Sequence, residues 1–390
     1  MRLIASSWKG RVGPAQERKR TVKLTVQPED GIEPILSALN KAKKSIHILI
    51  FRYDRSEIER ALVEAIQRGV NVQALIAFTN RGEEKNLRKL EMRLLEHGIT
   101  VARTADDLVR YHGKMFIIDR KELHLLAFNF THMDITLSRS FGAIITDKKL
   151  VDEAIKLFEA DAHRTPFVST NHDLVVSPVN ARKELTAFIN GAKKQLLLYE
   201  MKLSDPDFIK LLLHKIADGV EVRVLGRAAQ KSSALPMRVI AQRLHARVIV
   251  RDGKMAFLGS QSLRKLELEA RREIGVIFRD AAAVKKIVAT FEKDWSTATP
   301  LQTDSLEGAM ELPVRRMAKL VSKHVNVKPM VEQALEKMME RSSSDVPFEP
   351  GEVAQTVREA LRDEVHDAVV LALRDMAAHA GEPVMETKAD

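Results

Sequence analysis

Two stretches of the chain share one pattern of residues. The first reads Tyr111-His112-Gly113-Lys114-Met115-Phe116-Ile117-Ile118-Asp119, and the second reads His245-Ala246-Arg247-Val248-Ile249-Val250-Arg251-Asp252. Each contains a histidine, a cation two positions later and, after four further residues, an aspartate. The run that follows each cation is mostly apolar, which predicts a buried strand beginning at the motif. Since residues i and i+2 share one face of a strand, the histidine and the cation are expected to project together.

The two motifs belong to an internal repeat. The sequence at 40–44 recurs at 190–194, and 69–72 recurs at 219–222, both with an offset of 150 residues. From His112 onward the offset is 133, which relates His112 to His245 and Asp161 to Asp294. Each copy alternates strand-like runs with amphipathic helix-like stretches, as at 45–51, 57–67, 70–78, 87–96 and 114–118. We therefore expect an α/β fold with two copies of one unit, at 30–165 and 175–300.

The two ends of the chain differ from the repeat. Residues 1–29 read as a basic N-terminal extension, and 301–390 show only helical periodicity, broken by a Ser/Pro/Gly-rich stretch at 342–351. The tail is expected to be all-helical and to dock or to mediate oligomerisation. No signal peptide or run of 18 apolar residues is found, so we expect no transmembrane segment. Cytoplasmic localisation is expected, with peripheral contact at a membrane left open.

Composition and charge narrow the chemistry. The chain has no cysteine, which excludes disulfides, thiol nucleophiles and Cys-ligated metals. The net charge of +10 is unevenly divided. Residues 1–300 hold 52 basic and 36 acidic side chains (+16), whereas 301–390 hold 11 and 17 (−6). A basic core of this kind indicates an anionic partner such as phospholipid or nucleic acid.

The paired motifs make the chain resemble the phospholipase D superfamily, whose signature is H-x-K-x4-D followed by G-S-x-N, present twice. The resemblance covers about 30–300. It implies a duplicated α/β/α sandwich whose units are related by a pseudo-twofold axis. The second copy has Arg247 in place of lysine. Of the G-S-x-N residues, 126–129 retain only Asn129, and 259–262 retain Gly259 and Ser260.

The resemblance also implies a mechanism. One histidine attacks phosphorus and forms a covalent phosphohistidine, and the other protonates the leaving group and then activates water or an alcohol. Histidine suits both roles, nucleophile and proton donor, because its ordinary pKa is about 6.5. Neither a cofactor nor a metal is expected. The expected site residues are His112, Lys114, His245, Arg247, Asn129, Ser260, Glu273, Asp119 and Asp252.

Roles within this set follow from the same resemblance. Lys114, Arg247 and Asn129 would hold the non-bridging oxygens, and Ser260 could add a hydrogen bond. Glu273 would orient His245, while the first copy has Ser140 at that position. This asymmetry favours His245 as the nucleophile, but the family often gives that role to the first histidine, so the assignment is left open.

The two aspartates of the motifs are equally compatible with a catalytic role and with a structural cap after the motif strand. A structural role would place Asp119 and Asp252 outside the reacting centre, at the ends of their strands.

Three functions fit these residues. The first is a metal-independent phosphodiesterase or phosphatidyltransferase acting on phospholipid, which predicts an apolar rim around the histidines. The second is a nuclease of the same superfamily, which predicts a continuous basic groove. The third is a degraded member that binds phosphate without turnover, in which the histidines would lie too far apart to share one phosphorus. We favour the first, slightly over the second.

Overall fold

The computed structural model describes residues 22–78, 84–228 and 235–300. The helical tail expected at 301–390 lies outside the described residues, as does most of the basic extension. Residues 22–27, however, were assigned to that extension and instead form β1, the edge strand of the first sheet. Apolar and polar residues alternate along Val22–Gln27, which is typical of a strand, although the residues before it are rich in lysine and arginine.

The first half contains one sheet and its covering helices. The sheet order is β1-β8-β7-β6-β2-β3-β4. The strands are β1 Val22–Gln27, β2 Ser45–Ile50, β3 Asn71–Ile76, β4 Thr100–Arg103, β5 Arg110–Tyr111, β6 Met115–Ile118, β7 Glu122–Leu126 and β8 Ser138–Ile145. The helices are α1 Glu33–Lys41, α2 Ser56–Gln67, α3 Glu84–Glu96 and α4 Lys148–His163, with a π-helical turn, η1, at Met133–Leu137.

The second half repeats this plan, with sheet order β18-β12-β11-β10-β14-β15-β17-β9. The strands are β9 Leu174–Val176, β10 Gln195–Leu203, β11 Glu221–Ala228, β12 Met237–Val239, β13 Arg243–Leu244, β14 Arg247–Arg251, β15 Met255–Gly259, β16 Arg271–Arg272, β17 Ile274–Phe278 and β18 Thr299–Pro300. The helices are α5 Ala181–Asn190, α6 Pro206–Ala217, α7 Lys265–Glu269 and α8 Ala281–Thr297. The expected duplicated α/β architecture is confirmed.

Local sequence explains these elements. Helix α2 buries Ile58, Ala61, Leu62 and Ala65, which recur at helical spacing and face one side. Gly69, at φ +80°, follows α2 and turns the chain into β3, and its repeat mate after α6 does the same at φ +82°. Asp147 caps α4 and its repeat mate, Asp280, caps α8, in both cases through backbone N–H groups of the first turn.

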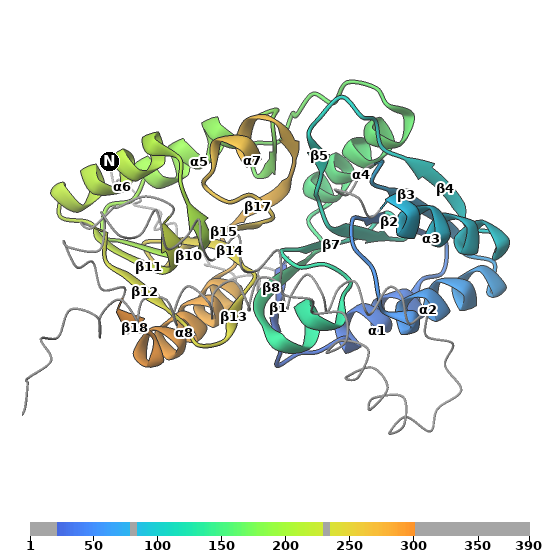
Figure 1. Cartoon of the computed structure of the whole chain (residues 1–390), viewed down its shortest axis with the longest axis horizontal. Helices are drawn as coiled ribbons and strands as arrows, with labels where there is room; N and C mark the ends of the chain where they lie inside the picture. Colours follow the sequence, from blue (N-terminus) through green and yellow to red (C-terminus); the bar gives the residue numbers. More distant parts are fainter. Residues whose placement is uncertain (1–21, 79–83, 229–234, 301–390) are drawn as a thin grey trace, which may run out of the picture.

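Three apolar cores hold the layers together. One lies between the first sheet and α1–α3, and a second lies between the other sheet and α5–α6. The third is shared: α4, α8 and the remaining faces of both sheets form a single cluster that spans the two halves. In Figure 1 the halves lie side by side, and a half-turn about the centre of the view carries α1 and α2 onto α5 and α6, and α4 onto α8. The direction of view is thus nearly parallel to the pseudo-twofold axis.

Short strands and buried ion pairs join the halves in matched pairs. Strand β5 pairs in parallel with β16, and β13 pairs in parallel with β8. Arg139 donates to Asp294 at 2.8 Å, while its repeat mate Arg272 contacts Asp161 at 3.1 Å. Each pair takes its arginine from one half and its carboxylate from the other. The interface is therefore fixed twice by the same contacts.

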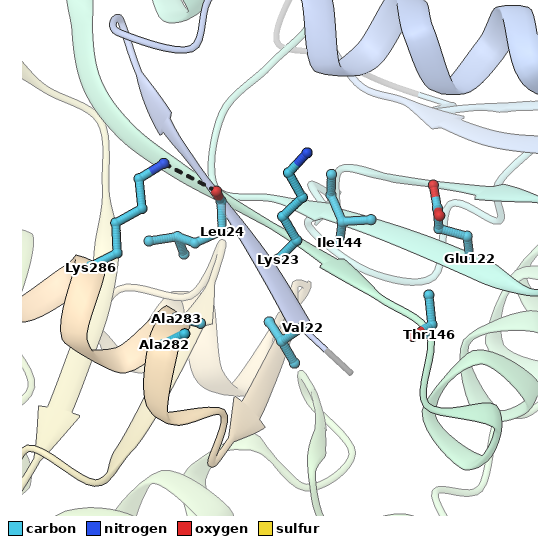
Figure 2. A pocket seen from close by; sticks show the side chains of 9 residues that line it. All are labelled: Val22, Lys23, Leu24, Glu122, Ile144, Thr146, Ala282, Ala283 and Lys286. Carbon is cyan, nitrogen blue, oxygen red and sulfur yellow. Dashed lines mark hydrogen bonds between the residues drawn. The ribbon is translucent and has the colours of Figure 1, made fainter. Parts of the chain in front are cut away.

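A groove is lined by residues other than the two histidines. This groove, of about 600 Å³, runs between β1 and α8, lined by Val22, Ile144, Ala283 and Lys286 among others (Figure 2). The Lys286 ammonium lies at this groove and donates to the carbonyl oxygen of Leu24 at 3.3 Å.

Among the described residues, no helix combines the length and apolarity required to span a bilayer.

Candidate active site

The backbone at the interface between the halves places both histidines. His112 follows β5, and its N–H donates to the carbonyl of Arg272 at 2.7 Å. His245 follows β13, and its N–H donates to the carbonyl of Arg139 at 3.0 Å. Both side chains are buried. Each histidine is thus held by a strand of the opposite half, and neither half alone has this arrangement.

The carboxylate beside His112 comes from the other half. Oε2 of Glu273 lies 2.9 Å from Nδ1 of His112. Since a carboxylate can only accept, this contact places the imidazole hydrogen on Nδ1 and the lone pair on Nε2, which lies 2.9 Å from the Lys114 ammonium. We expected Glu273 to orient His245, and that expectation is wrong. The reason is the interface: β16 runs beside β5, so the residue after Arg272 reaches the first histidine.

His245 has a carboxylate of its own that the sequence analysis missed. Oδ1 of Asp134 lies 2.8 Å from Nδ1 of His245. Asp134 also accepts from the backbone N–H of Asn129 at 2.9 Å and from its side-chain amide at 2.7 Å. Arg243 completes the cluster at 2.6 Å. Asn129 therefore holds Asp134 through two hydrogen bonds.

The repeat contains the signal that would have found Asp134. An offset of 133 relates it to Glu267, which accepts from the backbone N–H of Ser262 at 2.7 Å, as Asp134 does from Asn129. Ser140, the repeat mate of Glu273, instead donates its hydroxyl to the carbonyl of His245 at 2.5 Å. The two halves thus support their histidines with different residues.

Two cations converge on the histidines, as expected from the motif spacing. Lys114 is only 1% exposed, and its ammonium lies 2.9 Å from Nε2 of His112 while donating to the carbonyl of that residue at 2.7 Å. Arg247 donates through Nε to the hydroxyl of Ser262 at 3.2 Å. Nη1 of Arg247 and Oδ1 of Asn129 are buried with no hydrogen-bond partner among the described residues. These two atoms suit an incoming oxyanion and a protonated ligand atom, respectively.

Burial dominates the electrostatics of the rings. It lowers the pKa of His112 well below the usual value, with Lys114 and Arg247 adding to the effect. It lowers the pKa of His245 to about 4, although Asp134 opposes the shift. Because Arg247 from the second half acts on His112 and Asp134 acts on Lys114, the two half-sites share one electrostatic environment. Both imidazoles are neutral in the unliganded protein at neutral pH.

The two carboxylates behave differently. Burial raises the pKa of Glu273, against the opposing influence of Lys114. Burial would also raise the pKa of Asp134, but His245 and Arg243 hold it well below its usual range. Asp134 is therefore the more firmly ionised of the two. Ser260 is buried beside Glu273, and its hydroxyl accepts from the N–H of Ile274 at 3.1 Å.

The aspartates of the motifs lie outside this cluster, at the opposite ends of the motif strands. Asp119 accepts from the backbone N–H groups at 43–45, with the shortest contact, to Lys44, at 2.6 Å. Asp252 accepts in the same way from 193–195, with Lys194 at 2.7 Å. Of the two interpretations offered by the sequence, the structural cap is the one that fits. No group of three or more potential metal-ligating His, Asp or Glu side chains occurs in 22–78, 84–228 and 235–300.

Comparisons with known proteins identify the family of the chain. The family model described as "Cardiolipin synthase, PLD-like domain" matches residues 35–162 and 185–295, more than half of the chain. The polyphosphate kinase of Pseudomonas aeruginosa is 26% identical over 220 residues, a match that covers 53% of this chain and 31% of that protein. A probable cardiolipin synthase of Bacillus subtilis is 21% identical over 345 residues, 73% of this chain and 67% of that protein.

A solved structure of another protein has the same fold. The crystal structure of polyphosphate kinase from Porphyromonas gingivalis superimposes with a TM-score of 0.63 at 19% identity, covering 73% of this chain and 49% of that one. At this identity the likeness concerns the fold alone. The family match extends over both repeats and includes both histidine motifs. The chain therefore belongs to the phospholipase D superfamily.

Proposed function

We propose that this protein transfers a phosphoryl-containing group through a covalent phosphohistidine, with a phosphodiester as substrate and a phospholipid as the favoured one. The observation that carries the proposal is the pairing of each buried histidine with a carboxylate at Nδ1. At His112 the hydrogen bond places the proton on Nδ1, and in both rings the carboxylate lies on the Nδ1 side, which leaves Nε2 on the side away from it. Lys114 and the unpartnered Nη1 of Arg247 supply positive charge for the non-bridging oxygens.

The first step uses His112 as the nucleophile. Its Nε2 lone pair attacks phosphorus, a P–N bond forms, and the P–O bond to the leaving alcohol breaks. His245, protonated at both nitrogens, gives its Nε2 proton to the departing alkoxide. Although His245 is neutral in the unliganded site, the negative charge of a bound phosphodiester would raise its pKa. In the second step His245 takes a proton from water or an alcohol, which attacks phosphorus and releases His112.

The two carboxylates favour His112 as the nucleophile and His245 as the acid, and not the opposite assignment. A firmly ionised Asp134 stabilises the imidazolium form of His245, which the acid role requires. Glu273, whose pKa is raised by burial, places less negative charge behind His112. The preference for His245 as nucleophile depended on Glu273 contacting that histidine. Since Glu273 contacts His112, the same reasoning now favours His112 as the nucleophile.

Exposed apolar side chains on the segments that carry the site support a lipid substrate. Val109, before His112, is 54% exposed; Leu137, after Asp134, is 53% exposed; Leu266, beside Glu267, is 36% exposed. Val109 directly precedes β5, Leu137 is the last residue of η1, and Leu266 lies on α7. We call these three residues the apolar rim. They fit the acyl chains or interface of a membrane, which implies peripheral contact.

A second candidate is transfer from a phosphoanhydride, as in the polyphosphate kinases that the chain matches. Further arginines surround the histidines besides Arg247, and four of them are buried or contact the site carboxylates: Arg110, Arg243, Arg271 and Arg272. A cluster of guanidinium groups suits a polyanion better than it suits a single phosphodiester.

One experiment separates these candidates. The full chain is incubated with phosphatidylglycerol vesicles, bis-p-nitrophenyl phosphate, polyphosphate with ADP, and single-stranded DNA, each with and without EDTA. We expect turnover of the first two, unaffected by EDTA, and its loss in His112→Ala. His245→Ala should accumulate an acid-labile phosphoenzyme with the nitrophenyl ester, whose leaving group needs no proton. Full activity in either variant would exclude the shared two-histidine site, and turnover of polyphosphate alone would select the second candidate.

A further inference from the structure

The surroundings of the second cation differ from those of the first at four linked positions. The repeat relates Lys114 to Arg247, and strand register relates the residues beside them. In the first half the set is Ile50, Ile76, Lys114 and Asn129; in the second half it is Glu200, Gly226, Arg247 and Ser262. In the second half Glu200, Gly226 and Arg247 lie on neighbouring strands of one sheet; in the first half Ile50 and Ile76 do, and Lys114 directly precedes β6. The lysine-to-arginine change is therefore part of a coordinated difference.

Glu200 is the most unusual member of the set. It is 3% exposed and lies directly opposite Arg247 in the antiparallel pairing of β10 with β14. Directly paired residues project from the same face of a sheet with their Cβ atoms within about 5.5 Å of each other. Its carboxylate accepts from the backbone N–H groups of Lys202 at 3.1 Å and Leu263 at 2.9 Å. Burial raises its pKa to about 7, while Arg247 opposes the shift.

The backbone is shaped to admit this carboxylate. The β10–β11 register shifts between Glu200 and Leu203, which is a local bulge. Gly226 lies beside it at φ +152°, and a Cβ at that position would collide with the carbonyl oxygen of Glu200. Its mate, Ile76, lies in an uninterrupted ladder opposite Ile50. A bulge and a glycine at this point re-aim the end of β10.

The two cations also differ in what holds them. The ammonium of Lys114 is anchored on the carbonyl of His112. The equivalent carbonyl, of His245, is already occupied by the hydroxyl of Ser140. Arg247 is instead anchored on Ser262, and the next residue, Leu263, is tied to Glu200. The arginine thus depends on the loop at 260–263, which Glu200 holds.

We propose that Glu200 is a positioning residue for Arg247, whose carboxyl group fixes the loop that anchors the guanidinium and so keeps Nη1 aimed at the substrate phosphate. This inference rests on the proposed function for its substrate class. In the first half the carbonyl of His112 holds the cation of Lys114. In the second half Ser262, with its loop fixed by Glu200, would hold the cation of Arg247. Glu200 itself would not touch the substrate.

The test is a double-mutant cycle that copies the first half into the second. Glu200→Ile, Arg247→Lys and the double variant are compared with wild type by calorimetric titration of tungstate, an oxyanion that mimics the transferred phosphate. We expect each single change to weaken tungstate binding about tenfold, as for a lost charge-assisted hydrogen bond. Because Glu200 acts only through the guanidinium of Arg247, we expect the double variant to be no weaker than the weaker of the two single variants. Glu200→Gln, which keeps the shape and removes the charge, should resemble Glu200→Ile.

Glu153→Gln is the matched control. Glu153 is also buried and also accepts a backbone N–H, from Thr170, but it lies on α4 away from both cations. Its loss should lower the melting temperature and leave tungstate affinity unchanged. Strictly multiplicative losses in the double variant would overturn the proposal, as would unchanged affinity in Glu200→Gln or failure of the wild type to bind tungstate. Wild type that binds tungstate but turns over no substrate would contradict the proposed reaction, and the cycle would still decide the role of Glu200.

Discussion

Glu273 and His112 stand on opposite halves of the molecule, 161 residues apart in the chain, with the carboxylate 2.9 Å from Nδ1 of the ring. The reciprocal contact, between Asp134 and His245, is 2.8 Å. Each half therefore lends a carboxylate to the histidine of the other. The reacting centre is a property of the interface, and its two acid–histidine pairs differ in the charge they hold.

Asp134 should matter most for substrates with poor leaving groups. Asp134→Asn removes the ionised partner that favours the imidazolium form of His245, so protonation of the leaving alcohol is impaired. We expect turnover of a phospholipid to fall about a hundredfold or more, and that of a p-nitrophenyl ester to fall much less. Steady-state kinetics on both substrates measures the ratio. Asp119→Asn, which removes a cap, should lower the melting temperature and leave both rates unchanged; equal losses on both substrates in Asp134→Asn would contradict the assignment.

Glu273 should act on the nucleophile instead. Glu273→Gln replaces the carboxylate beside Nδ1 of His112 with a neutral amide that supports the developing positive charge on the ring less well, so both substrates require the same impaired attack. We expect formation of the phosphoenzyme to slow by a similar factor, about 10- to 100-fold, whatever the leaving group. Rapid-quench measurement of the first turnover tests this. A loss confined to alcohol leaving groups would instead make His112 the acid.

The contribution of His245 to stability should fall as the pH falls from about 6.5 toward 4. The pKa of His245 is about 4 in the folded protein and about 6.5 when unfolded, so over this interval only the unfolded chain binds the proton. Stability is then fully present above pH 6.5 and decreases below it, by about 3 kcal/mol at pH 4 from this histidine alone. Urea unfolding at several pH values gives the slope. His245→Asn should flatten it, and an unchanged slope would show that the ring is not buried neutral.

The ion pairs between the halves should stabilise the assembled site. Arg139→Ala leaves the carboxylate of Asp294 buried with only the hydroxyl of Tyr199, which donates to it at 2.7 Å. We expect a loss of about 3 kcal/mol in the free energy of unfolding. Arg120→Ala, which breaks an exposed pair with Glu159, should cost less than about 1 kcal/mol. Similar small losses in both variants would mean that the buried pair does not hold the interface.

The apolar rim should govern binding to lipid surfaces. Leu137→Ser and Val109→Ser each remove an exposed apolar side chain beside the site, and burying such a side chain in an interface stabilises by about 1.5 to 3 kcal/mol. Flotation with phosphatidylglycerol vesicles should show weaker binding in both variants, while hydrolysis of the soluble nitrophenyl ester is retained. Met92→Ser is the control, because Met92 is 57% exposed on α3, which carries no site residue. Unchanged flotation would argue for a soluble substrate.

Much of this arrangement could be predicted from the residues alone. The offsets of 150 and 133 predicted the duplication, which the structure confirms because helical and strand periodicity are local properties of the chain. The spacing of His112 and Lys114 predicted that both would project from one strand, but β5 ends at Tyr111 and β6 begins at Met115, so both residues lie in the segment between these strands. The edge strand β1 was missed because its basic flanks obscured a short alternating pattern.

The sequence by itself determined the fold class, the repeat and the identity of the paired histidines and cations, since each depends on neighbours within one element or one offset. Only the tertiary structure decided which carboxylate serves which histidine, that Asp119 and Asp252 are caps, and that Glu200 lies behind Arg247. Those relationships depend on how two strands from different halves pair across the pseudo-twofold axis. A hydrogen bond between residues 161 positions apart has no periodicity to reveal it, because the packing of the halves, and no local preference, brings its two ends together.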